Sequence, residues 1–152
     1  MTGITLVFTK GGDKTDRLDI RRADGSVERI DCPKQGIIPH DMVHYAVEHA
    51  LGARGFLGRV AAGEAARFGM AAETESDSVE RLVEVMQGDA WSGGGTEPEA
   101  MIDLYRVTCE ARGCPMLPLD AGTIEAIRQE LGRLTADWNA VPVGGALTLR
   151  LD

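Results

Sequence analysis

The chain has 152 residues and a formal net charge of −8, with 43% hydrophobic and 26% charged residues. These proportions are ordinary for a globular protein, and the length predicts one domain with a substantial core. The acidic balance, without a basic patch, argues against nucleic acid and anionic membranes as partners. The N-terminus lacks the basic start of a signal peptide, the hydrophobic runs are too short to cross a membrane, and the three cysteines are an odd number. We therefore expect a cytoplasmic protein with reduced thiols.

The first part of the chain predicts an antiparallel meander of three strands. Hydrophobic and polar residues alternate in residues 4–8 and 17–21, and a third strand is expected at residues 27–32. Asp24-Gly25 lies between the second and third strands, and this dipeptide is typical of a hairpin with a type I′ turn. Because charged side chains alternate with apolar ones, one face of this sheet is expected to be wet.

A helix is predicted between Pro39 and Gly52. Proline suits the first helical position, and glycine commonly follows the last one. Val43, Val47 and Leu51 recur at helical spacing, so one side of this helix is expected to be buried.

The middle of the chain is less regular. Residues 56–64 are compatible with a short helix or an irregular apolar wall, and residues 65–72 could extend a helix that Gly69 interrupts. Two capping boxes then predict two helix starts, and glycines predict the two ends. The first helix is expected from Asp77 to Gly88 with Glu80 as capping partner, and the second from Thr96 to Gly113 with Glu99 as capping partner.

The C-terminal part predicts one more helix, at about residues 123–138, and a last strand at residues 146–151. Together the elements predict a single α+β domain over residues 1–152. An antiparallel sheet of the three N-terminal strands plus the C-terminal strand would pack against a helical middle region. The C-terminal strand could instead pair with a second subunit, so a homodimer is also expected. The helix at about residues 123–138 has a hydrophobic stripe that consists of Ile124, Ile127, Leu131, Leu134 and Trp138.

The strongest concentration of reactive side chains is in the helix after Pro39, which carries all three histidines. His40, His44 and Glu48 are four residues apart and so lie on one face. Two histidines at this spacing can bind one metal ion, with Glu48 as third ligand and Asp41 as a base or an orienting partner. Zinc and non-haem iron both accept such ligands. The pattern departs from the H-E-x-x-H zinc signature, because Asp41 replaces its glutamate.

Two other interpretations of the same residues stay open. His44 and Glu48 can form a simple ion pair that stabilises the helix. The same pair can also work as a metal-free acid and base, although the chain has no G-x-S-x-G nucleophile motif.

The run from Pro39 to Glu48 reads P-H-D-x-x-H-x-x-V-E, and Gly55-Phe56 and Ala62-Gly63 follow it. With the preceding Asp24-Gly25-Ser26 hairpin, it resembles a pattern in small uncharacterised bacterial proteins. The resemblance covers roughly the N-terminal 65 residues. It implies a bacterial origin and nothing about chemistry.

Two functions are compatible with these features. The first is a domain that binds a small molecule or a protein partner, with the histidine row as a polar rim. The alternative is a metal-binding protein, including a hydrolase, with zinc or iron as cofactor at His40, His44 and Glu48. The residues leave open whether the protein is an enzyme.

Overall fold

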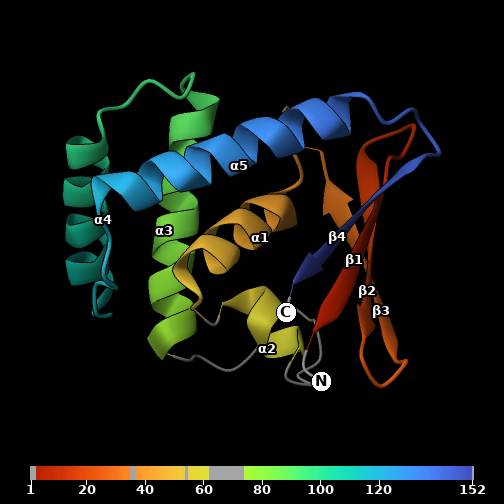
Figure 1. The fold of residues 1–152 in the computed structure, drawn as a ribbon, viewed down its shortest axis with the longest axis horizontal. Coiled ribbons are helices and arrows are strands. Elements are labelled where there is room, and N and C mark those ends of the chain that lie inside the picture. Colours follow the sequence, from red (N-terminus) through yellow and green to blue (C-terminus); the bar gives the residue numbers. More distant parts are fainter. Residues whose placement is uncertain (1–2, 35–36, 54, 62–73, 152) are drawn as a thin grey trace.

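The computed structural model describes residues 3–34, 37–53, 55–61 and 74–151. Over these residues the fold is α+β, with a four-stranded antiparallel sheet on one side and five helices beside it (Figure 1). The fold class is therefore as the sequence predicts. The region 65–72, in which an extended helix is expected, lies outside the described residues.

The sheet has the strand order β3-β2-β1-β4, and every pairing is antiparallel. β4 pairs with β1 inside the chain, with Ile4 opposite Leu151 and Thr9 opposite Ala146. The C-terminal strand thus completes the sheet of its own chain, and pairing with a second subunit is not needed to place it. The strands are β1 (Ile4–Thr9), β2 (Thr15–Arg22), β3 (Val27–Pro33) and β4 (Ala146–Leu151).

The hairpin between β2 and β3 differs from the predicted turn. A type I′ turn needs a positive φ at both central residues. Among the described residues, only glycines have a positive φ, and Gly25 is the one in this loop. The Gly25 amide donates to the Arg22 carbonyl and the Arg22 amide to the Ser26 carbonyl, which encloses a three-residue loop. Asp24 therefore has an ordinary backbone and uses its side chain to accept hydrogen bonds from Ser26.

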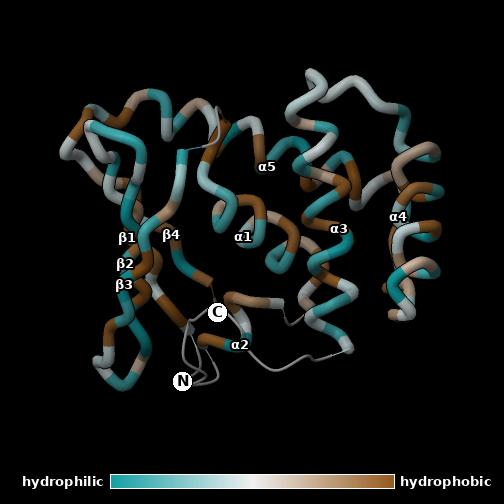
Figure 2. Tube along the Cα trace, turned by 180° about the vertical axis from the view of Figure 1, so that it is seen from behind, coloured by the Kyte–Doolittle hydropathy of each residue, from teal (hydrophilic) through white to brown (hydrophobic). Residues whose placement is uncertain are grey.

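The helices form a layer in which α1 is central. α1 lies between the sheet and α3, α5 crosses over both helices, and α4 lies outermost against α3 (Figure 1). Figure 2 shows hydrophobic stretches on the strands and on α1. Among the described residues, no helix is both long and apolar enough to span a bilayer. The helices are α1 (His40–Leu51), α2 (Phe56–Ala61), α3 (Thr74–Trp91), α4 (Pro98–Arg112) and α5 (Ala121–Asn139).

The core explains why these segments take these forms. The inward residues of β1 and β2 alternate strictly, as period-two strands require, and are fully buried. The predicted stripe of α5 is buried along its whole length, and Asp120 caps that helix by accepting from the Thr123 amide. Gly52 ends α1 in the left-handed conformation, as predicted.

Two helix boundaries differ from the prediction. α3 already includes Thr74 and continues through Gly88 to Trp91, so the predicted Asp77 cap lies inside the helix. α4 begins at Pro98 after Glu97, and no side-chain hydrogen bond caps it. On α4, Met101, Tyr105 and Cys109 are buried, whereas Leu104 is exposed.

Candidate metal centre

The side chains of α1 divide into an apolar side and a polar row. Val43, Ala46 and Val47 are buried in the core, so the orientation of the helix is fixed by packing. His40 and His44 are on the adjacent side, with ring centroids 4.8 Å apart and the rings nearly perpendicular. This side faces α3 rather than the sheet, because both imidazoles contact Glu80.

His44 is the buried centre of the cluster. Its Nε2 lies 2.8 Å from Glu80 Oε2, and its Nδ1 lies 3.3 Å from Glu48 Oε2. The second contact is short but poorly aligned, since Nδ1 has no hydrogen bond of good geometry among the described residues. Burial by itself lowers the pKa of His44, but the two carboxylates outweigh it and raise the pKa to about 10. In the metal-free protein, His44 is therefore an imidazolium between two carboxylates.

Glu80 closes the cluster from α3. Its Oε1 lies 3.6 Å from His40 Nε2, so one carboxylate spans both imidazoles. Burial opposes its ionisation, yet the two histidines hold the pKa of Glu80 below its usual range. One ligand atom from each of His40, His44 and Glu80 lies within 4.8 Å of the others. About a third of the Glu80 and His40 side chains is exposed, so the cluster is open to solvent on one side.

His40 is oriented by a second residue of α3. Its Nδ1 lies 3.0 Å from Gln87 Oε1, and an amide oxygen can only accept. Nδ1 therefore carries a proton, and Nε2 is the ring nitrogen that faces Glu80. This is the arrangement in which a histidine coordinates through one nitrogen while the other is held by a hydrogen bond.

Glu48 holds the turn after α1 and stays outside the ligand cluster. Its carboxylate accepts three backbone hydrogen bonds, from the amides of Gly55, Leu57 and Gly58 at 2.9, 3.1 and 2.8 Å. It thereby satisfies the free N–H groups at the start of α2. Glu80, and not Glu48, contacts the Nε2 atoms of both imidazoles. Glu48 instead faces the opposite nitrogen of His44, where it can orient the ring.

Asp41 and His49 lie apart from the cluster. Asp41 faces β3, where its Oδ2 accepts from the Cys32 thiol at 3.7 Å. Burial raises the pKa of Asp41, although the positive charge of His44 and His40 opposes this shift. Burial and the nearby carboxylate of Asp41 together raise the pKa of the Cys32 thiol to about 12. His49 is exposed and stacks on Tyr45.

Sequence reasoning did not find Glu80, because the capping pattern assigned it to a helix start. Its position has one local indication. Glu80 and Gln87 are seven residues apart, and this spacing places both on the same side of a continuous helix. Three other acids of α3 and α4 do not join the cluster. Glu84 pairs with Arg81, Asp103 pairs with Arg106, and Glu110 is exposed.

The arrangement brings together three groups that can ligate a metal ion, and one side of the cluster is exposed. Ligands of a tetrahedral zinc ion lie about 3.3 Å apart, given bonds of about 2.0 Å. The Glu80 contacts of 2.8 and 3.6 Å go to its two different carboxylate oxygens, and the three ligand atoms lie within 4.8 Å of one another, so a bound zinc ion would draw them closer together. Comparison with known proteins finds no matching family model, no matching curated protein and no matching solved structure.

Proposed function

We propose that the protein binds a divalent transition-metal ion, Zn²⁺ or Fe²⁺, through His40 Nε2, His44 Nε2 and the carboxylate of Glu80. The observation that carries the proposal is the convergence of these three ligand atoms from α1 and α3. Two histidines and one carboxylate are a ligand set that both metals use when open positions remain for water or substrate.

The surrounding residues support the same function. Gln87 fixes the tautomer of His40 that presents Nε2, and Glu48 faces the nitrogen of His44 opposite the proposed metal. Carboxylate–histidine–metal chains of this kind are common around protein-bound zinc.

Charge also favours a cation at this point. With both imidazoles neutral, Glu80 leaves one negative charge beside the two Nε2 atoms and Glu48 leaves a second one behind His44, and a divalent ion balances this charge. In the metal-free protein, the proton on His44 provides part of this balance. A metal ion therefore has to displace that proton, so metal binding competes with the ion pair that protonated His44 forms with the two carboxylates.

The test is metal binding by the full chain without a histidine tag. Chelator-treated protein is titrated with Zn²⁺ by calorimetry, and with Fe²⁺ under anaerobic conditions, followed by elemental analysis. We expect one ion per chain. Co²⁺ in place of zinc gives an absorption spectrum that reports the coordination number.

The decisive variant is Glu80→Gln, because Glu80 is partly exposed and its loss leaves the core intact. Glu84→Gln, one turn further along α3, is the matched control because Glu84 points to solvent and pairs with Arg81. We expect Glu80→Gln to weaken zinc binding at least about a hundredfold, as loss of a ligand predicts, and Glu84→Gln to leave it unchanged. Equal affinity in the two variants, or no stoichiometric metal in the wild type, would overturn the proposal.

A further inference from the structure

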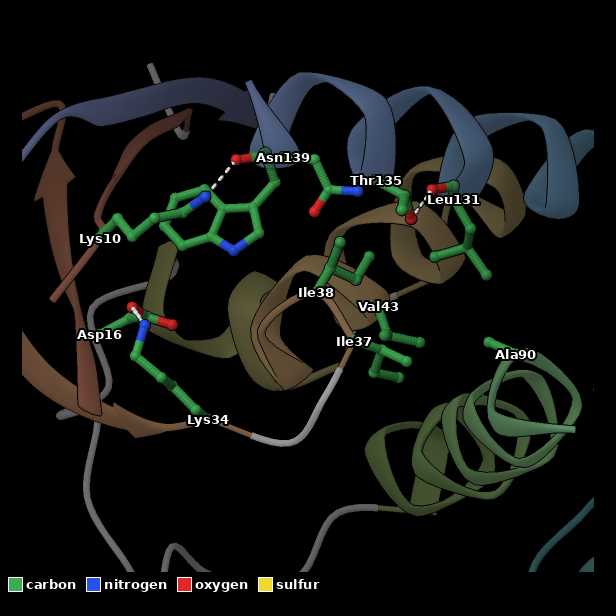
Figure 3. A pocket seen from close by; sticks show the side chains of 11 residues that line it. Lys10, Asp16, Lys34, Ile37, Ile38, Val43, Ala90, Leu131, Thr135 and Asn139 are labelled. Carbon is green, nitrogen blue, oxygen red and sulfur yellow. Dashed lines mark hydrogen bonds and ion pairs between the residues drawn. The ribbon is translucent and has the colours of Figure 1, made fainter. Parts of the chain in front are cut away.

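A cavity of about 490 Å³ lies on the other side of α1, between the end of the sheet and α5. This volume is typical of small-molecule sites. Figure 3 shows the side chains that surround this space, including Ala90 from the end of α3. The others come from the ends of the strands, from α1 and the residues before it, and from the last turns of α5.

One wall of the cavity is polar and carries a net positive charge. Lys10 directly follows β1, Lys34 directly follows β3, and Asp16 belongs to β2 (Figure 3). Asp16 Oδ1 accepts from Lys34 Nζ at 2.6 Å and from the Gly11 amide at 2.9 Å, so this carboxylate is paired. Within the described part of the chain, Lys10 has no carboxylate partner. Its Nζ donates to the Trp138 carbonyl at 2.6 Å and lies 4.7 Å from the centre of the Trp138 ring.

The two lysines retain donors for a ligand. An ammonium group has three N–H donors, and the contacts above use one on each lysine. The wall therefore combines two cations with one anion, in a chain whose net charge is −8. A local excess of positive charge in an acidic protein favours an anionic ligand at this wall.

The rest of the cavity has an apolar wall, which meets the polar wall at Trp138. Ile38 and Val43 line it from the entry to α1 and from α1 itself, and Leu131 and Trp138 line it from α5. All four residues are at least nine-tenths buried, so packing fixes their positions. Such a wall binds a hydrocarbon or aromatic body and excludes a second charged group.

We propose that this cavity binds a small organic monoanion with an apolar body, such as an aryl- or alkyl-carboxylate. The carboxylate contacts Lys10 and Lys34, and the apolar body lies against Ile38, Leu131 and Trp138. This is small-molecule binding, the first of the two functions expected from the sequence, and it is independent of the metal centre on the α3 side of α1.

The test uses three probes that share one body: 4-phenylbutyrate, the neutral 4-phenyl-1-butanol and the cationic 4-phenylbutylamine. Trp138 is the reporter, because it lines the cavity. The exposed Trp91 is removed as Trp91→Phe, which leaves Trp138 as the only tryptophan. We expect saturable binding of one 4-phenylbutyrate per chain, with a change in Trp138 emission and a rise in Tm. The alcohol should bind at least about tenfold more weakly, as loss of charge-assisted hydrogen bonds predicts, and the amine should not bind.

Variants locate the site. Lys10→Met should weaken 4-phenylbutyrate binding about tenfold. Lys14→Met is the matched control, because Lys14 is exposed in the β1–β2 turn outside the cavity. Thr135→Phe, from an exposed face of α5 at the cavity, should block binding without disturbing the core. The proposal is overturned if no probe binds saturably at millimolar concentration, if the alcohol binds as tightly as the carboxylate, or if Lys10→Met behaves like Lys14→Met.

Discussion

Glu48 and Gly55 are in contact across the turn that joins α1 to α2. The Gly55 amide donates to Glu48 Oε1 at 2.9 Å, and a Cβ on residue 55 would lie 2.8 Å from Glu48 Cδ and 2.6 Å from Val79 Cγ1. Real Cβ atoms do not approach other atoms so closely, so residue 55 has to be glycine for the carboxylate to reach the backbone.

The first prediction follows from this contact. Gly55→Ala should lower the free energy of unfolding by about 1–3 kcal/mol, because neither the buried carboxylate nor Val79 has room to move. Urea denaturation measures the effect. Gly88→Ala is the control, because a Cβ there meets nothing within 4 Å and the position is helical. It should raise stability by about 0.5–1 kcal/mol, and a loss in both variants would contradict the packing argument.

Replacing Glu48 itself should be more costly. Glu48→Gln keeps the shape but removes the charge that three backbone amides and His44 share. We expect a loss of about 3 kcal/mol, typical of a broken buried charge network. Chemical denaturation with and without zinc separates the two roles of Glu48. If Glu48 orients His44, zinc affinity falls about tenfold to a hundredfold but survives, whereas a true ligand would be lost outright.

The ion pair between Asp89 and Arg128 predicts a pH dependence. Asp89 accepts from Arg128 Nε and Nη2 at 3.2 Å and from the Thr96 amide at 3.1 Å. Burial alone would raise the pKa of Asp89, but these bonds outweigh it and hold the pKa below its usual value. A depressed pKa contributes stability above the unfolded value of about 3.9, and the contribution is lost as pH falls through the folded pKa.

Asp89→Asn should therefore cost about 2 kcal/mol at neutral pH and progressively less below about pH 4. Urea denaturation of the wild type and the variant at both pH values measures this difference. Asp103→Asn, on an exposed residue that pairs with Arg106, should show almost no difference at either pH. A difference for Asp89→Asn that stays constant with pH would rule out the carboxylate as its source.

Tyr105 ties α4 to the rest of the helical layer. Its buried hydroxyl donates to the Ser78 carbonyl at 2.9 Å and accepts from the Leu117 amide at 3.3 Å. Tyr105→Phe leaves both backbone groups without this partner and should cost about 1–2 kcal/mol. Hydrogen exchange provides the specific readout, because the Leu117 amide should lose protection in the variant. Unchanged exchange at Leu117 would show that the contact does not contribute.

The spacing of hydrophobic residues correctly predicted the strands and helices that bury one side. The alternation in residues 4–8 and the stripe from Ile124 to Trp138 each fit one period, and both are buried as expected. Glycines were less reliable as predictors of where a helix ends. Gly88 does not end α3, since a glycine inside a helix costs only about 1 kcal/mol and packing overrides it.

The candidate site was predicted only in part, for a physical reason. Spacing within one helix can show that His40 and His44 share a face, but it cannot show which distant helix packs against that face. Glu80 reaches the imidazoles because α3 packs on α1, a tertiary contact with no local pattern. Glu48 satisfied the helical spacing, yet the free amides at the start of α2 compete for its carboxylate.

The pairing of β1 with β4 has a consequence for the assembly state. Without residues 146–151, β1 would present an unpaired row of backbone donors and acceptors along one side. Such an edge pairs readily with another chain. β4 is itself an edge strand in the order β3-β2-β1-β4, so proteolytic removal of residues 146–151 would move the edge of the sheet to β1 and free the backbone groups that β4 now pairs. Light scattering after limited digestion should then rise with protein concentration.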